Sequence, residues 1–105
     1  MTTVMPIQKT QTELVSKKKL DSPRFYQVVM FNDDFTPMDF VTRLLIQIFN
    51  MDELQANQIM LEIHHLGQAI CGVYPREIAE MKVSQVLSLA HQEAHPLLCI
   101  FELAI

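Results

Sequence analysis

The stretch FNDDFTPMDFVTRLL, residues 31–45, is decisive for the fold because an apolar run stops at Asn-Asp-Asp and resumes as a helix. The preceding residues RFYQVVMFN are β-branched and aromatic, which is typical of a strand. The residues FTPMDF resemble a helix start, with Thr36 as the N-cap, Pro37 at the first helical position and Asp39 in the first turn. The intervening polar residues are either a simple connector or a binding group displayed beside an apolar patch.

Two helices are predicted to follow this polar stretch. Apolar residues at helical spacing continue the first helix to about Asn50. Residues 51–67 predict a second helix, which Asp52 and Gln55 cap at its start and Gly67 ends.

The remaining residues complete a β-α-α-β-α-β order. Residues 68–74 predict a strand, residues 75–94 a third helix that Pro75 opens, and residues 96–104 a last strand. Apolar residues at helical spacing supply the apolar side of the second helix: Leu54, Ile59, Met60 and Ile63. A buried stripe is predicted for the third helix: Ile78, Ala79, Val83, Val86, Leu87 and Ala90. This order predicts an α/β fold, an α+β sandwich in which three helices cover a small three-stranded sheet.

Length and charge indicate one domain with a distinct amino-terminal segment. A chain of 105 residues with 50% hydrophobic content suffices for one core. Residues 1–23 are polar, rich in Thr, Gln and Lys and without a sustained period, which predicts a flexible tail ahead of a domain over residues 24–105. The net charge of −4 and the lack of a basic stripe argue against a nucleic-acid partner.

The sequence predicts a cytoplasmic protein that does not bind a membrane. No stretch approaches the roughly 18 apolar residues of a membrane span, and the amino-terminal residues lack an apolar signal core. Cys71 and Cys99 lie far apart in apolar segments, so we expect buried, reduced thiols, with a disulfide as the alternative. We expect a soluble monomer.

The polar groups allow two classes of function, an enzyme or a binding module. The Asn-Asp-Asp cluster and a histidine could bind a metal or carry acid–base chemistry, but the sequence has no cysteine cluster or glycine-rich phosphate loop. His91 and His95 are interpreted as helix-end residues, where a cation is favoured. We therefore expect no enzyme, cofactor or metal. His64 lies four residues after Met60 on the same helical face, either as a core-rim residue or as a ligand contact. Acceptors beside an apolar pocket suit a ligand with a cationic head and an apolar side chain.

Three stretches resemble the ClpS family of bacterial protease adaptors: VVMFNDDFTPMDFV, MLEIHHLGQAICGVY and HPLLCIFE. The resemblance covers residues 26–102 and implies the small sandwich shared with the carboxy-terminal domain of a ribosomal stalk protein. It implies an adaptor that binds proteins beginning with Leu, Phe, Tyr or Trp, called N-degrons, and delivers them to the ClpA unfoldase of the ClpAP protease. A stalk-like domain that binds translation factors, and that needs no Asn-Asp-Asp cluster, is the alternative.

The resemblance also implies roles for individual residues. It places Asn32, Asp33, Asp34 and His64 around the free N-terminal amine, with direct contact, contact through water and support of the turn all open for Asp33. An ammonium group has three N–H donors, and its burial is costly unless each donor meets an acceptor. Five residues match the hydrophobic pocket of the family, with ordinary core packing as the alternative: Met38, Val41, Met60, Ile63 and Leu97.

Two charged residues of the third helix match positions that dock on the unfoldase in the family. They are Glu77 and Lys82, and the alternative for each is an exposed helix charge. The resemblance further implies that the adaptor binds the amino-terminal domain of the unfoldase, and that the amino-terminal tail engages the unfoldase while the substrate is handed over.

Overall fold

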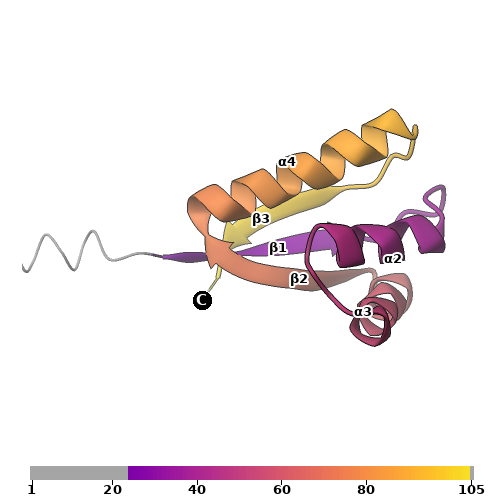
Figure 1. Ribbon diagram of the computed structural model, residues 1–105, viewed down its shortest axis with the longest axis horizontal. Helices are drawn as coiled ribbons and strands as arrows, with labels where there is room; N and C mark the ends of the chain where they lie inside the picture. The colour runs from indigo at the N-terminus through magenta and orange to yellow at the C-terminus, as the bar shows by residue number, and fades with distance from the viewer. Residues whose placement is uncertain (1–23, 105) are drawn as a thin grey trace, which may run out of the picture.

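The first strand of the chain is the central strand of a three-stranded antiparallel sheet in the computed structural model, which describes residues 24–104 (Figure 1). β1 (Phe25–Phe31) pairs with β2 (Gln68–Pro75) on one side and with β3 (Cys99–Leu103) on the other, in the order β2-β1-β3. All three predicted strands are confirmed. The tail predicted for residues 1–23 lies outside the described residues.

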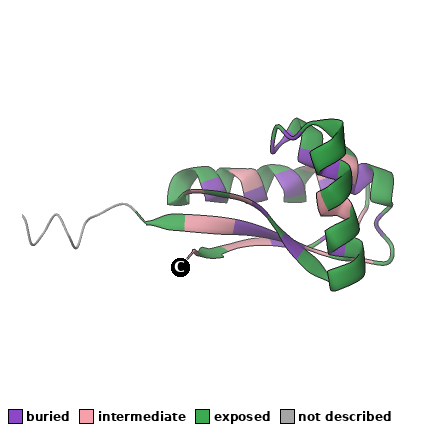
Figure 2. Cartoon of the chain, turned by 90° about the horizontal axis from the view of Figure 1, so that it is seen from below, coloured by how far each residue is buried: buried purple, intermediate pink, exposed green. Residues whose placement is uncertain are grey.

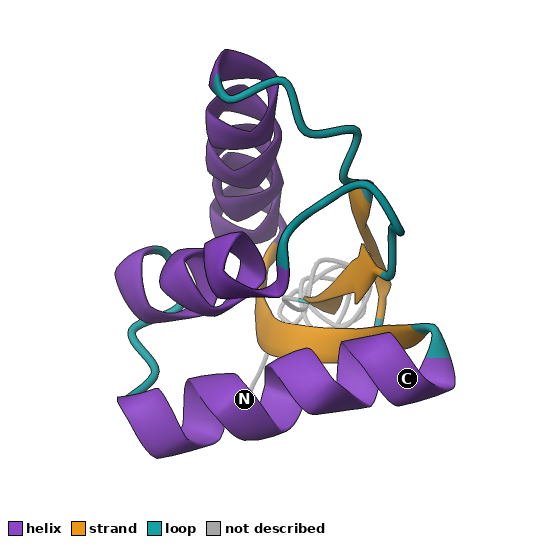
Figure 3. Ribbon diagram, turned by 90° about the vertical axis from the view of Figure 1, so that its right-hand side faces the viewer, coloured by secondary structure: helices purple, strands orange, loops and turns teal. Residues whose placement is uncertain are grey.

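Three helices pack on one side of this curved sheet, as the view along the strands shows (Figure 3). They are α2 (Met38–Gln47), α3 (Glu53–Leu66) and α4 (Arg76–Gln92), so the predicted element order and α/β fold class are confirmed. Since strand side chains alternate, Val28 and Met30 of β1 enter the helix-facing core and are fully buried. Figure 2 shows buried residues in the middle of the sheet and along the inner sides of the helices.

The two cysteines lie in this core. Cys71 and Cys99 are both buried and free, which confirms the prediction of reduced thiols. Burial raises the pKa of each thiol to about 12, so both stay protonated at neutral pH.

The start of α2 differs from its prediction. The helix begins at Met38, and Pro37 occupies the N-cap position without a side-chain cap. Thr36 is not the cap, because its hydroxyl donates to the Asp33 carboxylate at 2.8 Å and its side chain is buried. The carboxy-terminal end is also earlier than predicted, at Gln47, and Asn50 adopts a left-handed conformation with φ of 58°.

The boundaries of the other helices follow their sequence signals more closely. Asp52 caps α3, where its side chain accepts from the backbone N–H of Gln55 at 2.8 Å, and Gly67 ends the helix with φ of 93°. Pro75 is the N-cap of α4 and not its first residue, and the helix ends at Gln92, before the predicted Ala94.

Two residues of the predicted buried stripe of α4 are exposed, and so is one residue of the apolar side of α3. Leu54 is 70% exposed, and Ile78 and Leu87 are each 38% exposed. The sheet has only three strands, so it covers a narrow stripe of each helix and leaves flanking apolar side chains at the margin. None of the helices in residues 24–104 has the length and hydropathy needed to span a membrane.

Candidate ligand-binding site

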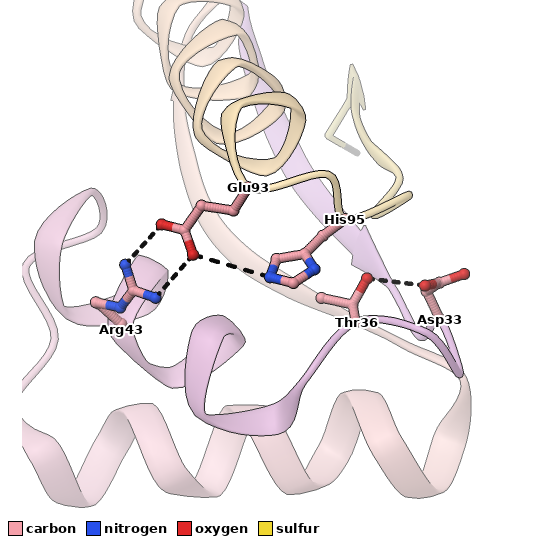
Figure 4. Close-up of polar contacts among 5 residues, drawn as sticks. All are labelled: Asp33, Thr36, Arg43, Glu93 and His95. Carbon is pink, nitrogen blue, oxygen red and sulfur yellow. Dashed lines mark hydrogen bonds and ion pairs between the residues drawn. The ribbon is translucent and has the colours of Figure 1, made fainter.

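The Asn-Asp-Asp cluster lies in the turn between β1 and α2, and Asp33 holds this turn together. One carboxylate oxygen of Asp33, Oδ2, accepts from the backbone N–H of Phe35 at 3.1 Å and from the Thr36 hydroxyl at 2.8 Å. The backbone N–H of Thr36 also donates to the Asp33 carbonyl at 3.2 Å. Such side-chain bonds to following residues are the usual way in which Asp stabilises a turn. Figure 4 shows Asp33 and Thr36 at this position.

The backbone at the end of β1 is fixed from two sides. Phe31 donates its backbone N–H to the Leu98 carbonyl at 3.0 Å, and Asn32 donates to the Gly67 carbonyl at 2.9 Å. Gly67 directly follows α3, and Leu98 directly precedes β3. The Asn32 side chain is therefore positioned where the end of α3, the start of β3 and the turn converge.

A cavity of about 280 Å³ brings the predicted amine-binding residues together. Its lining comes from the β1–α2 turn, the start of α2 and the last turn of α3: Asn32, Asp33, Asp34, Thr36, Pro37, Met38 and His64. Asn32, Asp34 and His64 are exposed, so their acceptor atoms are open to a ligand. The lining contains two carboxylates and neither lysine nor arginine, which favours a cationic group.

The predicted hydrophobic-pocket residues divide into three groups. Met38 lines the same cavity as the polar cluster and is 42% exposed. Val41, Ile63 and Leu97 are buried members of the core beneath it. Met60 is partly buried and lies one helical turn before His64, where it lines a neighbouring cavity.

The two predicted docking residues have different environments on α4. Glu77 is exposed in the first turn of the helix. Lys82 is partly buried: its ammonium donates to the Ile48 carbonyl at 2.5 Å and lies 5.9 Å and 5.5 Å from the ring centroids of Phe49 and Tyr74. Lys82 therefore stabilises the end of α2, a contact that its sequence pattern did not indicate.

A polar cluster that the sequence reasoning missed joins α2 to the loop after α4 (Figure 4). Arg43 forms two hydrogen bonds with the Glu93 carboxylate, at 3.0 Å and 3.2 Å, and His95 lies 3.8 Å from the same carboxylate. The His95 ring packs edge-on against Phe40, with centroids 4.6 Å apart. Since these residues are far apart in sequence and follow no common period, only the folded structure reveals the cluster. It fixes the loop that leads to Leu97.

These features define a small α/β binding module. Acceptors from three segments surround one open cavity, apolar side chains lie directly beneath, and residues 24–104 hold no group of three or more His, Cys, Asp or Glu able to bind a metal ion.

Comparison with known proteins identifies the family. The model of the family described as ATP-dependent Clp protease adaptor protein ClpS matches residues 21–100. The ClpS adapter protein of Hydrogenovibrio crunogenus is 50% identical over 102 residues, which cover 93% of this chain and 98% of that protein. The protein of the same name from Shewanella piezotolerans is 54% identical over 86 residues, covering 82% of this chain and 84% of the relative. The chain belongs to the ClpS family of adaptors of the ATP-dependent Clp protease.

A solved structure of another member has the same fold. Agrobacterium tumefaciens ClpS2, determined bound to L-phenylalaninamide, matches with a TM-score of 0.76 and 35% sequence identity. The match covers 78% of this chain and 99% of that chain.

Proposed function

We propose that this chain binds proteins through a free N-terminal Leu, Phe, Tyr or Trp and delivers them to the ClpA unfoldase of the ClpAP protease. The observation that carries the proposal is the convergence of Asn32, Asp34 and His64 with Met38 on one cavity. The L-phenylalaninamide bound by the Agrobacterium relative has a free α-amine beside an apolar side chain. A protein that begins with Leu, Phe, Tyr or Trp presents the same two groups at its N-terminus.

The α-amine of the substrate is proposed to meet three acceptors. The Asn32 side-chain carbonyl, the Asp34 carboxylate and a ring nitrogen of neutral His64 can each accept one N–H. Asp33 supports these acceptors through the turn, because its carboxylate oxygen is already shared by Phe35 and Thr36. The negative charge of the lining offsets the cost of removing a cation from water.

The first side chain of the substrate is proposed to enter beside Met38, toward the apolar residues Val41, Met60, Ile63 and Leu97. Three of these are buried in the core, so the side chain must displace or reorient the methionines at the rim to reach them. Thioethers adapt readily to both aliphatic and aromatic groups, which suits a pocket for Leu, Phe, Tyr and Trp.

The proposed partner is the amino-terminal domain of ClpA, bound through Glu77 and the surface that Lys82 organises. In this scheme the chain acts as a monomeric cytoplasmic adaptor and catalyses no reaction itself. The substrate is released to the unfoldase, and residues 1–23 take part in that step.

Binding of a labelled peptide that begins with Leu, with and without N-acetylation, tests the proposal by fluorescence anisotropy. Acetylation removes the charge of the amine and one or more of its donors, so we expect binding to be lost. Loss of one partner in a buried charged pair typically costs about 2–5 kcal/mol, so Asn32→Ala, Asp34→Ala and His64→Ala should each weaken binding at least about tenfold. Equal affinity for the acetylated peptide would exclude recognition of the N-terminus.

A further inference from the structure

A second cavity lies between α2 and α3, beside the candidate ligand-binding site. It has a volume of about 430 Å³. Both helices contribute to its lining: Asp39, Thr42, Arg43, Ile46 and Gln47 from α2, and Asn57 and Met60 from α3. We call this cavity the α2–α3 groove.

The α2–α3 groove adjoins the candidate site along both helices. On α3, Met60 of the groove lies one turn before His64 of the site. On α2, Asp39 of the groove directly follows Met38 of the site. The groove then extends toward Ile46, about 12 Å along the helix from Met38 at 1.5 Å per residue.

The groove offers an apolar floor between polar ends. Ile46 is 38% exposed and Met60 is partly buried, so both present apolar surface that an additional side chain can cover. The Arg43 guanidinium is already paired with Glu93 and lies 5.1 Å from the Phe40 ring centroid, so it is not a free cation for a ligand. This chemistry favours an apolar occupant over an acidic one.

The spacing of the two cavities matches the repeat of an extended peptide. Side chains of an extended chain alternate, so the first and third residues point to the same side, about 6.6 Å apart at 3.3 Å per residue. The first side chain is proposed to enter beside Met38, and the groove residues Thr42 and Ile46 lie about 6 Å and 12 Å farther along α2 at 1.5 Å per residue. A peptide with its amine at Asn32 and its chain along the helices would place its third side chain over the groove.

We propose that the α2–α3 groove binds the side chain of the third substrate residue and prefers an apolar one. The second side chain points to solvent and contributes little. This proposal rests on the proposed function, because the amine at Asn32 sets the register of the peptide. It adds a second specificity position to the N-terminal residue itself.

Labelled peptides that begin Leu-Ala-Ala, Leu-Phe-Ala and Leu-Ala-Phe, followed by one common sequence, test the register by fluorescence anisotropy. Burying part of a Phe ring against Ile46 and Met60 should tighten binding of Leu-Ala-Phe by about three- to tenfold over Leu-Ala-Ala. Leu-Phe-Ala should bind like Leu-Ala-Ala. A gain for Phe at the second position equal to that at the third, or at neither position, would overturn the proposal.

Two protein variants provide a matched comparison. Ile46 and Ile78 are each 38% exposed on a helix, but only Ile46 lines the groove. Ile46→Asp should abolish the gain from Phe at the third position and leave Leu-Ala-Ala binding nearly unchanged, whereas Ile78→Asp should preserve the gain. Melting curves verify that both variants are folded, and retention of the gain in Ile46→Asp contradicts the proposal.

The same peptides separate failure of the groove from failure of the proposed function. If N-acetylated and free Leu-Ala-Ala bind equally, the amine is not recognised and the register of the peptide is undefined, which overturns both. If only the free peptide binds and the third residue has no effect, the proposed function stands and the groove proposal is wrong.

Discussion

Asp33 shows how a residue inside a binding motif can act on the backbone. Its Oδ2 atom accepts both the Phe35 N–H and the Thr36 hydroxyl, so the conformation of the turn depends on this one oxygen. The neighbouring Asn32 and Asp34 side chains are exposed at the cavity. The motif therefore combines one residue that shapes the turn with two that face a ligand.

A pair of substitutions at this position separates support of the turn from contact with the amine. The Asn side chain in Asp33→Asn retains a carbonyl oxygen that can accept both bonds, so this variant should keep peptide affinity within about threefold, less than 1 kcal/mol. Asp33→Ala loses both bonds and should weaken Leu-peptide binding at least about tenfold and lower the melting temperature, since one net hydrogen bond contributes about 1 kcal/mol. Anisotropy titrations and melting curves measure both effects. Equal loss of affinity in the two variants would indicate that the Asp33 charge itself contacts the amine.

Thr36 illustrates why single residues are harder to predict than elements. A Thr before Pro and ahead of an apolar helical pattern is typical of an N-cap, and the sequence carries no signal against it. In the structure, the Thr36 hydroxyl donates a hydrogen bond to the Asp33 carboxylate and is not available to cap the helix, and Pro37 occupies the N-cap position. Two local capping schemes compete here, and the choice between them depends on the course of the chain after β1.

At the scale of elements, the helices and strands are predictable from the sequence because their signals are local. Strong signals mark both ends of α3, where the Asp52 side chain and the left-handed Gly67 occupy the predicted positions. The order of the strands is a different matter, since pairing of β1 with both β2 and β3 depends on contacts between distant segments. The exposure of Ile78 and Leu87, which are predicted to be buried, has a similar cause: helical periodicity identifies the apolar side of a helix but not the width of the surface that covers it.

Contacts between elements also determine how the site is supported, and no local sequence pattern indicates these contacts. Arg43 on α2 and Glu93 after α4 are joined by two hydrogen bonds, and His95 adds a longer contact to the same carboxylate. This cluster ties α2 to the loop that carries Leu97 into the core.

The Arg43–Glu93 pair predicts a pH dependence of stability. Its hydrogen bond with Arg43 lowers the pKa of Glu93 from its ordinary value of 4.5, with smaller contributions from the charges of Arg43 and His95. A carboxyl with a lowered pKa stabilises the folded state above its unfolded value, and this contribution is lost as the pH falls through the lowered value. Arg43→Gln should thus reduce the melting temperature slightly at neutral pH, by an amount typical of an exposed pair.

The comparison of Arg43→Gln with the unmodified chain should be made across the acidic range. The difference in melting temperature should shrink as the pH drops below 4.5 and Glu93 becomes protonated. Glu93→Gln should reproduce the loss at neutral pH and show the same convergence in acid. A difference that is independent of pH would show that the packing of Arg43 against Phe40, and not its charge, stabilises α2.

At the scale of the whole molecule, the end of β1, which leads into the candidate ligand site, and the start of α4, which carries the proposed docking residue, lie at opposite ends of the sheet (Figure 1). Asn32 follows the last residue of β1, whereas Glu77 lies two residues after Pro75, which pairs with Phe25 at the start of β1. The seven residues of β1 separate the two ends, a span of about 20 Å for an extended strand. From this separation we expect that the proposed docking of the unfoldase at Glu77 leaves the candidate ligand site accessible to a peptide.

Charge reversal at Glu77 tests this separation. Glu77→Lys should weaken docking on the amino-terminal domain of ClpA by about tenfold or more and leave Leu-peptide affinity unchanged. Glu80→Lys, one turn along α4, serves as the control with the same charge change. Lys82 is less suitable, because Lys82→Ala also removes the bond to the Ile48 carbonyl and should lower the melting temperature. Equal docking by Glu77→Lys and the unmodified chain would place the docking surface elsewhere.

Deleting residues 1–20 tests whether recognition and delivery are separate properties of the chain. Every residue proposed to bind the peptide follows Arg24, so the truncated chain should keep its peptide affinity and its melting temperature. Docking through Glu77 should also survive. Delivery should fail if residues 1–23 take part in hand-over to the unfoldase, as the family resemblance implies.

The measurement is degradation of a fluorescent protein with an exposed N-terminal Leu, using the cognate unfoldase and peptidase. The truncated adaptor should give little degradation. A scrambled segment of equal length should restore it if only the length of the segment matters, because the reach of a flexible linker depends mainly on its number of residues. If the scrambled segment does not restore degradation, the unfoldase recognises the sequence of the original segment. Lys17, Lys18 and Lys19 are then the first positions to substitute. Normal degradation with the truncated adaptor would instead mean that docking at Glu77 and binding of the substrate are sufficient for delivery. Residues 1–20 would then have no part in hand-over.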